Sequence, residues 1–267
     1  MKTRTPKSEE EGQRRLAVLI DADNAQPSVI EGLLAEIAKF GVASVKRIYG
    51  DWTSTAHQQW KRALLRHSLS PVQQFAYTSG KNSTDSTLII DAMDLMYTRR
   101  FDGFCLVSSD SDFTRLAQRL REEGMVVFGF GEQKTPESFV AACDKFVYTE
   151  VLRPDTPKPE TSAPAKRAPS RPAAAPRGTR RAAGEATSSQ GLPLELIARA
   201  IEEASDDTGW APLGPVGSYL NKVRPDFDPR LYGHRKLSDL LRRNPRHFTV
   251  EERPGAGGAK SLFVRLA

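Results

Sequence analysis

Carboxylate and amide side chains follow two apolar segments of the chain, and their types point to metal chemistry. The run VLI is followed by Asp21, Asp23 and Asn24, and the run GFCLV is followed at a short distance by Asp110 and Asp112. Several carboxylates held close together repel one another, so such a cluster is costly unless a cation joins it. With oxygen ligands and no Cys or His among the polar residues that follow these runs, the cation that fits is Mg²⁺ or Mn²⁺. Such a site can promote in-line attack on a phosphodiester.

A third acidic segment lies between these two. The motif GKNSTD ends in Asp85, at the start of an expected helix with the sequence DSTLIIDAMDLMYTR. Asp91 comes six positions later, about 240° around a helix from Asp85 at roughly 100° per residue, so we expect it to support the site without joining it. Lys81 has two interpretations, as a surface lysine or as a contact to a phosphate.

Each of these acids also has an ordinary structural explanation. Asp23 is more readily explained as a turn residue that points away from the site. Asp112 and Asp85 are both in positions where they could cap the helices that follow them. Because a chance meeting of several caps at one edge is the weaker explanation, we favour a shared site.

The elements that must position these residues alternate between strand and helix. Strands are expected at 15–20, 42–50, 72–77, 103–109 and 125–131, and helices at 27–40, 55–67, 85–99, 112–124 and 136–143. This alternation predicts an α/β fold with a parallel sheet and helices on both faces. Ligands of such sheets bind beyond the carboxyl ends of the strands, which is where the acidic residues fall.

The excess positive charge lies between two expected domains. The net charge is +6, and residues 153–190 contain eight Arg or Lys against three Asp or Glu, a net +5. This stretch is rich in Pro, Ala and Ser and lacks apolar periodicity. It therefore predicts a disordered linker between an N-terminal domain at 14–152 and a C-terminal domain at 191–267. The linker is either a plain tether or a basic arm that contacts phosphates.

The C-terminal domain is expected to be a small α+β unit. Its patterns predict helices at 192–204, 215–223 and 234–244, and a hairpin of strands at 247–253 and 260–266. Three helices and a hairpin form the outline of a winged helix, whose third helix can face nucleic acid. The candidate RNA-binding residues in and beside that helix are Arg235, Lys236, Arg242 and Arg243. A solvated helix face or a surface for a protein partner is the alternative.

Composition excludes several classes of protein. No apolar run approaches the roughly 18 residues of a membrane span, and the charged N-terminal region has no apolar core of a secretory signal. Cys105 and Cys143 form no paired motif, which argues against a disulfide framework or a zinc site. We therefore expect a cytoplasmic protein with no membrane partner.

Two regions resemble known families. The motifs VLIDADN, GKNSTDSTLIIDAMD and LVSSDSDFTRLAQRLREEGMVVFGFG look like the NYN domain, a PIN-like nuclease fold, over roughly residues 14–150. The resemblance implies a Mg²⁺- or Mn²⁺-dependent ribonuclease. The corresponding metal and catalytic residues are Asp21, Asp85, Asp110 and, as a fourth acid, Asp112, with Asn24 matching the family's Asn after the first Asp. Residues 191–267 resemble the OST-HTH/LOTUS domain through LPLELIARAI, YGHRKLSDLLRRNPRHFTV and the closing hairpin. Proteins with this pairing are RNA-processing or RNA-binding proteins.

Three functions follow as hypotheses. The first is a metal-dependent ribonuclease, acting as an endonuclease, with a tethered RNA-binding module. The second is an RNA-binding or adaptor protein with little or no catalytic activity. The third is a phosphatase or nucleotidase acting on a small phosphate ester. The motif IDADN partly matches an Asp-x-Asp nucleophile, but Ala25 stands where that motif has Thr. The class of RNA and the oligomeric state are left open.

Overall fold

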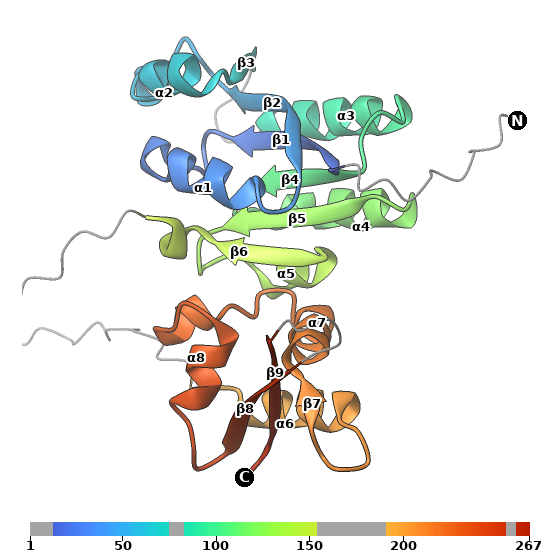
Figure 1. Cartoon of the computed structure of the whole chain (residues 1–267). Helices are drawn as coiled ribbons and strands as arrows, with labels where there is room; N and C mark the ends of the chain where they lie inside the picture. The colour runs from blue at the N-terminus through green and yellow to red at the C-terminus, as the bar shows by residue number, and fades with distance from the viewer. Residues whose placement is uncertain (1–12, 75–82, 154–190, 255–259) are drawn as a thin grey trace, which may run out of the picture.

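The structure, a computed structural model, consists of an α/β domain followed by a smaller α+β domain (Figure 1). It describes residues 13–74, 83–153, 191–254 and 260–267. The predicted linker therefore lies outside the described residues, apart from Arg153. Within the residues that the structure describes, no helix is long and apolar enough to cross a membrane.

The first domain is built on a six-stranded sheet. Its strands are β1 (Arg15–Asp21), β2 (Val42–Gly50), β3 (Ser70–Gln73), β4 (Gly103–Val107), β5 (Val126–Gly131) and β6 (Lys145–Tyr148). They lie in the order β3-β2-β1-β4-β5-β6, and every pair is parallel. The chain winds outward from the centre in both directions, so the strand order reverses between β1 and β4. In sheets of this kind, ligands bind at that switch point.

Helices cover both faces of the sheet. The helices are α1 (Ile30–Ile37), α2 (Trp60–His67), α3 (Ser83–Tyr97), α4 (Thr114–Glu122) and α5 (Glu137–Ala142). Short 3-10 turns precede α1, α2 and α4, namely η1 (Pro27–Val29), η2 (Thr55–His57) and η3 (Ser111–Phe113), and a fourth, η4 (Thr149–Leu152), follows β6. Apolar residues of α1 and α2 pack on one face, and those of α3, α4 and α5 pack on the other. The predicted α/β architecture is confirmed.

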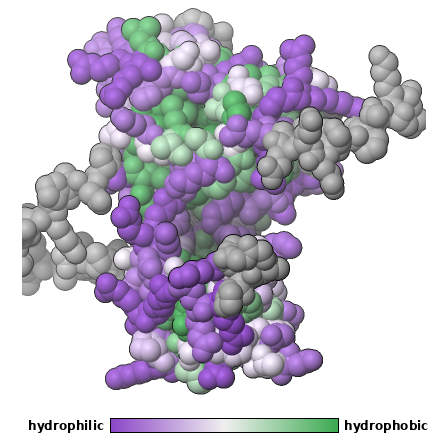
Figure 2. Space-filling view, viewed as in Figure 1, coloured by the Kyte–Doolittle hydropathy of each residue, from purple (hydrophilic) through white to green (hydrophobic). Residues whose placement is uncertain are grey.

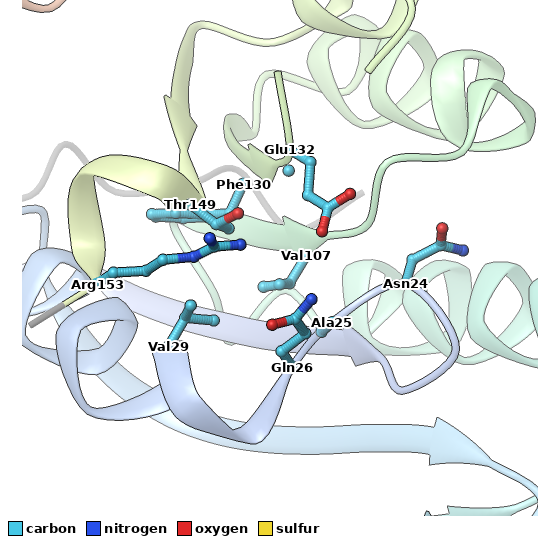
Figure 3. Close-up of a pocket in the computed structure, with 10 residues that line it drawn as sticks. Asn24, Ala25, Gln26, Val29, Val107, Phe130, Glu132, Thr149 and Arg153 are labelled. Atoms are coloured by element: carbon cyan, nitrogen blue, oxygen red, sulfur yellow. The ribbon is translucent and has the colours of Figure 1, made fainter. Parts of the chain in front are cut away.

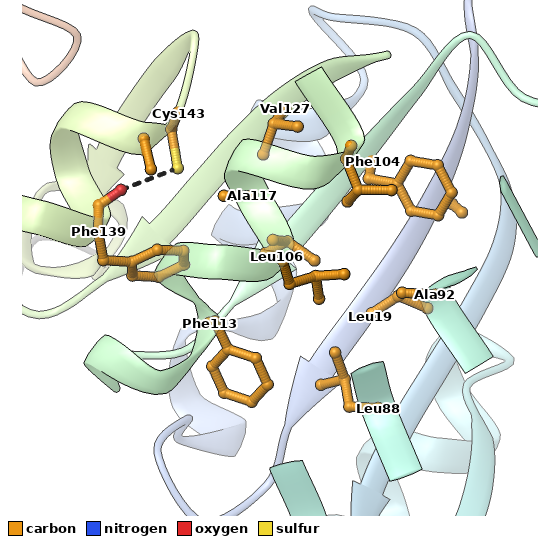
Figure 4. Close-up of a cluster of buried hydrophobic side chains, with 14 of the residues drawn as sticks. Leu19, Leu88, Ala92, Phe104, Leu106, Phe113, Ala117, Val127, Phe139 and Cys143 are labelled. Atoms are coloured by element: carbon orange, nitrogen blue, oxygen red, sulfur yellow. Dashed lines mark hydrogen bonds between the residues drawn. The ribbon is translucent and has the colours of Figure 1, made fainter. Parts of the chain in front are cut away.

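The core is divided into two clusters by the alternation of side chains along the strands. In β1, Ala17 and Leu19 face α3 to α5, whereas Val18 and Ile20 face α1 and α2. All four are fully buried, as expected for a central strand of a parallel sheet. Figure 4 shows the first cluster, in which Leu19 lies among side chains from α3, α4 and α5. The burial of β1 on both faces fixes the point at which its polar end leaves the sheet.

The second domain packs three helices on a small antiparallel sheet. Its elements are α6 (Leu194–Ala204), β7 (Ala211–Pro212), α7 (Leu213–Val223), η5 (Pro229–Tyr232), α8 (Leu237–Arg242), β8 (Phe248–Pro254) and β9 (Lys260–Leu266). The strand order is β7-β9-β8. Its core draws on all three helices and the hairpin, with Ile197, Val216, Leu240 and Val264 each fully buried. The predicted small α+β domain is confirmed.

A few expected boundaries differ from the structure. The third strand runs over Ser70–Gln73, earlier than predicted, because it pairs with the end of β2 at an edge of the sheet where Pro71, which lacks an N–H, is tolerated. Residues 75–77 of that prediction lie outside the described residues. The second helix of the C-terminal domain begins at Leu213, and Pro215 falls in its first turn, where a missing N–H costs little. Strand β4 ends at Val107, so the two serines after it leave the sheet.

Candidate functional site

Asp21 lies at the carboxyl end of β1 and is 1% exposed. Its Oδ2 accepts hydrogen bonds from Asn24 Nδ2 at 2.7 Å and from Ser108 Oγ at 2.9 Å, and its Oδ1 accepts one from the Asp23 backbone N–H at 3.0 Å. Burial raises the pKa of Asp21, and the hydrogen bonds from Asn24 and Ser108 oppose that rise. The carboxylate is therefore well supplied with neutral donors, and a cation would stabilise its charged form further.

Ser108 joins the ends of β1 and β4. Its side chain is buried, and its Oγ accepts a hydrogen bond from the Asp110 backbone N–H at 3.1 Å while donating to Asp21. Gly131, at the end of β5, leaves room for this turn, because a Cβ there would lie 2.6 Å from the Ser108 carbonyl oxygen. Ser108 was not predicted as a site residue, although its position directly after a buried strand was a usable signal.

Asp110 begins the turn that leads into α4. Its Oδ1 accepts a hydrogen bond from the Asp112 backbone N–H at 2.9 Å, so Asp110 caps η3. The cap that was considered for Asp112 thus belongs to Asp110. Asp110 is half-buried, whereas Asp112 is exposed. Of these two acids, Asp110 is the one tied through Ser108 to the buried Asp21.

Asp85 lies in the first turn of α3, and its side chain lies outside the described residues, as does Lys81 entirely. Asp91 of the same helix accepts hydrogen bonds from Arg47 and from the hydroxyl of Tyr49, both on β2. Burial, and then Asp91, raise the pKa of Tyr49, so this phenol keeps its proton and remains a donor. Asp91 thus anchors α3 to the sheet, which agrees with the supporting role expected for it.

The oxygen donors at this edge suit Mg²⁺ or Mn²⁺ in their chemistry. Among the described side chains, no three or more His, Cys, Asp or Glu residues form a group that could hold a metal ion. Asp21 and Asp110 are brought together through Ser108. A third carboxylate has to come from elsewhere, and the first turn of α3 carries Asp85.

His57 connects two loops beside the site and was not predicted. Its Nε2 lies 3.2 Å from Asp23 Oδ1, and its Nδ1 lies 3.0 Å from the Asp51 carbonyl oxygen. The imidazole is almost fully buried and packs against Trp52. Asp23 is exposed and turns toward this histidine, which agrees with the expectation that it is a turn residue outside the acidic cluster.

A shallow pocket opens at the carboxyl ends of β4 and β5, next to Asn24. Figure 3 shows Arg153 and Glu132 extending toward it from opposite sides. Its volume is about 10 Å³, which is enough for one water molecule and far too small for a nucleotide. Arg153, which was assigned to the linker, supplies a cation at the edge.

The basic residues of the C-terminal domain lie on its surface. Arg235 and Lys236 precede α8, Arg242 is its last residue, and Arg243 follows it. All four are exposed. Hydrophilic residues make up much of the visible surface of this domain in Figure 2. The guanidinium of Arg253 lies 4.1 Å from the ring centroid of the buried Trp210. The exposed arginines and lysine remain candidate contacts for a phosphate backbone.

The fold and the site define a doubly wound parallel-sheet domain with carboxylates at its switch point, joined to a small helix-and-hairpin domain. A family model for the NYN domain matches residues 15–151, and one for the OST-HTH/LOTUS domain matches residues 191–258. The chain belongs to the NYN domain family and carries an OST-HTH/LOTUS domain, which confirms both resemblances. NYN domains are PIN-like nucleases and OST-HTH/LOTUS domains bind RNA, a pairing that fits a ribonuclease.

Several solved structures are also similar to this chain. An uncharacterized protein of Nitrosomonas europaea is 44% identical over 34% of this chain and 89% of its own, with a TM-score of 0.28. A protein of Chromobacterium violaceum is 37% identical over 30% of this chain and 84% of its own, with a TM-score of 0.25. A protein of unknown function from Vibrio parahaemolyticus is 18% identical over 52% of this chain and 95% of its own, with a TM-score of 0.43. No curated protein matches the chain.

Proposed function

We propose that this protein is a metal-dependent ribonuclease that cuts RNA internally at the carboxyl edge of the first sheet. The observation that carries the proposal is the link from Asp21 through Ser108 to Asp110 at the switch point between β1 and β4. Buried or half-buried carboxylates held by neutral donors at such a point are suited to a cation and a phosphate.

The residues that would hold Mg²⁺ or Mn²⁺ are Asp21, Asp85, Asp110 and, as a fourth acid, Asp112. When bound, the metal would stabilise the charge that develops on the phosphate and would activate the attacking water. Asn24 keeps Asp21 oriented through its amide, and Ser108 holds Asp21 and the Asp110 backbone in register. The N-cap role of Asp110 fixes the turn on which its carboxylate is carried.

We propose that the C-terminal domain supplies RNA affinity through the exposed basic residues beside α8. Arg235, Lys236, Arg242 and Arg243 are positioned to neutralise phosphates, which supports affinity without base specificity. Lys81 remains a proposed phosphate contact near the acidic site.

The test is cleavage of a circular RNA and of an end-labelled linear RNA with Mg²⁺, Mn²⁺ or EDTA. A circular substrate is cut only by an endonuclease. We expect cleavage with either metal, none with EDTA, and none with Asp110→Asn. Asn is also a good N-cap, so this variant keeps the turn while losing the charge.

The matched control is Asp94→Asn, an exposed acid on α3, which is expected to cleave normally. RNA binding without cleavage would favour the adaptor hypothesis instead. Turnover of a small phosphate ester without RNA cleavage would favour the phosphatase hypothesis.

A further inference from the structure

The edge strand β6 of the first domain is covered by the C-terminal domain. The backbone N–H of Phe146 donates to the carbonyl oxygen of Pro225 at 3.0 Å, across the two domains. This N–H faces outward from the sheet, because the other side of β6 pairs with β5. Pro225 lies between α7 and η5. We call residues 221–230, from the last turn of α7 to the start of η5, the docking segment. The docking segment thus makes a contact that a further strand would otherwise make.

Lys145 fixes the same junction with its side chain. Its Nζ donates to Asn221 Oδ1 at 2.6 Å and to the Phe227 carbonyl oxygen at 3.0 Å. Both acceptors belong to the docking segment. Burial lowers the pKa of Lys145, and the nearby Asp228 opposes that change. A buried ammonium group is stable only where hydrogen-bond acceptors surround it, so the contact between Lys145 and the docking segment is specific.

Arg230 makes the second connection, to α1 of the first domain. Its two terminal nitrogens donate to the two carboxylate oxygens of Glu36, each at 3.0 Å, while its Nε donates to Asp228 at 3.0 Å. Glu36 is 7% exposed and Asp228 is also 7% exposed. Two parallel hydrogen bonds fix the relative orientation of the guanidinium and the carboxylate, which is why such arginine pairs are common at interfaces.

A third connection lies at the carboxyl end of β6. The hydroxyl of Tyr148 donates to Asp226 Oδ2 at 3.0 Å, and Arg224 Nε donates to Asp226 Oδ1 at 3.1 Å. Asp226 is nearly buried between the two domains. The charged groups of this interface are therefore all hydrogen-bonded. Arg230 binds two carboxylates, Arg224 binds one, and Lys145 binds two neutral acceptors, a pattern unlike an accidental surface contact.

We propose that the docking segment holds the two domains together as one unit in solution, and that this unit aligns α8 with the acidic edge so that one RNA strand contacts both. The second half rests on the proposed function. Figure 1 shows α8 displaced toward the side on which β5 and β6 end, which is the side of Asp21 and Ser108. The linker then serves to connect domains that are already docked.

The first test measures the distance between the domains by paired spin labels, with no RNA or metal present. Labels go on Leu65→Cys in α2 and Glu203→Cys in α6, because both sites are exposed. The native Cys105 and Cys143 are buried and are expected to stay unlabelled. We expect one narrow distance distribution. A broad distribution in this chain would overturn the proposal.

Charge reversal at the interface gives the decisive comparison. Glu36→Lys, in the same labelled chain, is expected to broaden the distribution, and adding Arg230→Glu is expected to narrow it again. The matched control is Glu31→Lys, the same change on the exposed face of the same helix. A narrow distribution in Glu36→Lys would show that the pair of Glu36 and Arg230 does not hold the domains together, against the role proposed for the docking segment. Arg230→Ala serves as a second undocked variant, and circular dichroism checks that each variant is folded.

The alignment of RNA is tested separately by the positions of cleavage. The docked protein is expected to cut a long single-stranded RNA at a restricted set of positions, and Glu36→Lys at about twice as many or more. Identical products from both would overturn the alignment while leaving docking intact. A protein that does not cleave at all would defeat the proposed function and the alignment, and the spin-label distances would still decide docking.

Discussion

Ser108 donates its hydroxyl hydrogen to Asp21 across 2.9 Å, from the end of β4 to the end of β1. The two residues are 87 positions apart in the chain and are adjacent because their strands are neighbours at the switch point. This hydrogen bond links the acidic motif after β1 directly to the one after β4.

The variant Ser108→Ala removes that donor from a buried carboxylate. Hydrogen bonds to charged groups contribute about 1.5–3 kcal/mol, so we expect single-turnover cleavage to fall by about tenfold or more. Ser109→Ala is the matched control, because the hydroxyl of Ser109 accepts from the Glu132 backbone N–H instead. Equal losses in the two variants would show that the Ser108 contact has no special role.

The variant Asp91→Asn weakens the attachment of α3 to β2. The amide cannot accept from both Arg47 and Tyr49 as the carboxylate does, so we expect the free energy of unfolding to fall by about 1–3 kcal/mol. Because α3 carries Asp85, cleavage is expected to fall as well. Urea denaturation and initial rates measure the two effects. Asp94→Asn, on the exposed face of α3, is expected to change the free energy by less than about 0.5 kcal/mol.

The double variant Arg242→Ala with Arg243→Ala tests the surface beside α8. If both side chains contact phosphates, RNA affinity falls, and the slope of log affinity against log salt becomes shallower by about 0.7 for each lost contact to a single strand. Fluorescence anisotropy over a salt series gives both quantities. Arg199→Ala, an exposed arginine of α6, is the control. An unchanged slope in the double variant would remove this surface from the RNA path.

Domain docking is expected to weaken in acid. Burial alone would raise the pKa of Glu36, but Arg230 and Lys39 hold it below its ordinary value of 4.5. A carboxylate with a lowered pKa in the docked state favours docking above pH 4.5 and loses that contribution as the pH falls further.

The measurement for this pH dependence is the spin-label distance distribution between pH 7 and pH 3. We expect broadening below pH 4.5, with circular dichroism showing that both domains stay folded. Arg230→Ala, which lacks the partner of Glu36, should already be broad at pH 7. If the intact chain stays narrow to pH 3, Glu36 does not contribute to docking.

Much of the fold follows from local patterns. Strand β2 was predicted with its observed bounds, and β1 and β4 were predicted with their observed first residues. Continuous apolar runs of this length are typical of buried parallel strands. The end of β4 was predicted two residues late, because Ser108 and Ser109 are buried although they are polar. Their hydroxyls hydrogen-bond to Asp21 and to the Glu132 backbone N–H, at the ends of the neighbouring strands. The order of the strands was not predicted, since alternation fixes parallel pairing but not adjacency.

The site shows the same division between local and long-range information. Asn24 and Asp21 are three residues apart, and both were selected as site residues from a single short motif. The contact of Ser108 with Asp21 required the strand order. The pair of Glu36 and Arg230 is separated by 194 positions and leaves no pattern in the sequence, because either residue alone looks like an ordinary surface charge.

The covered edge of β6 has a practical consequence for handling this protein. An open strand edge carries a row of unpaired backbone groups that can recruit the same edge of another molecule. A chain cut after residue 152 would lose the docking segment that occupies the Phe146 N–H and the Lys145 side chain. Such a fragment would expose the edge of β6 to β-pairing with other molecules. The C-terminal domain is therefore expected to protect the first domain from aggregation through the edge of β6.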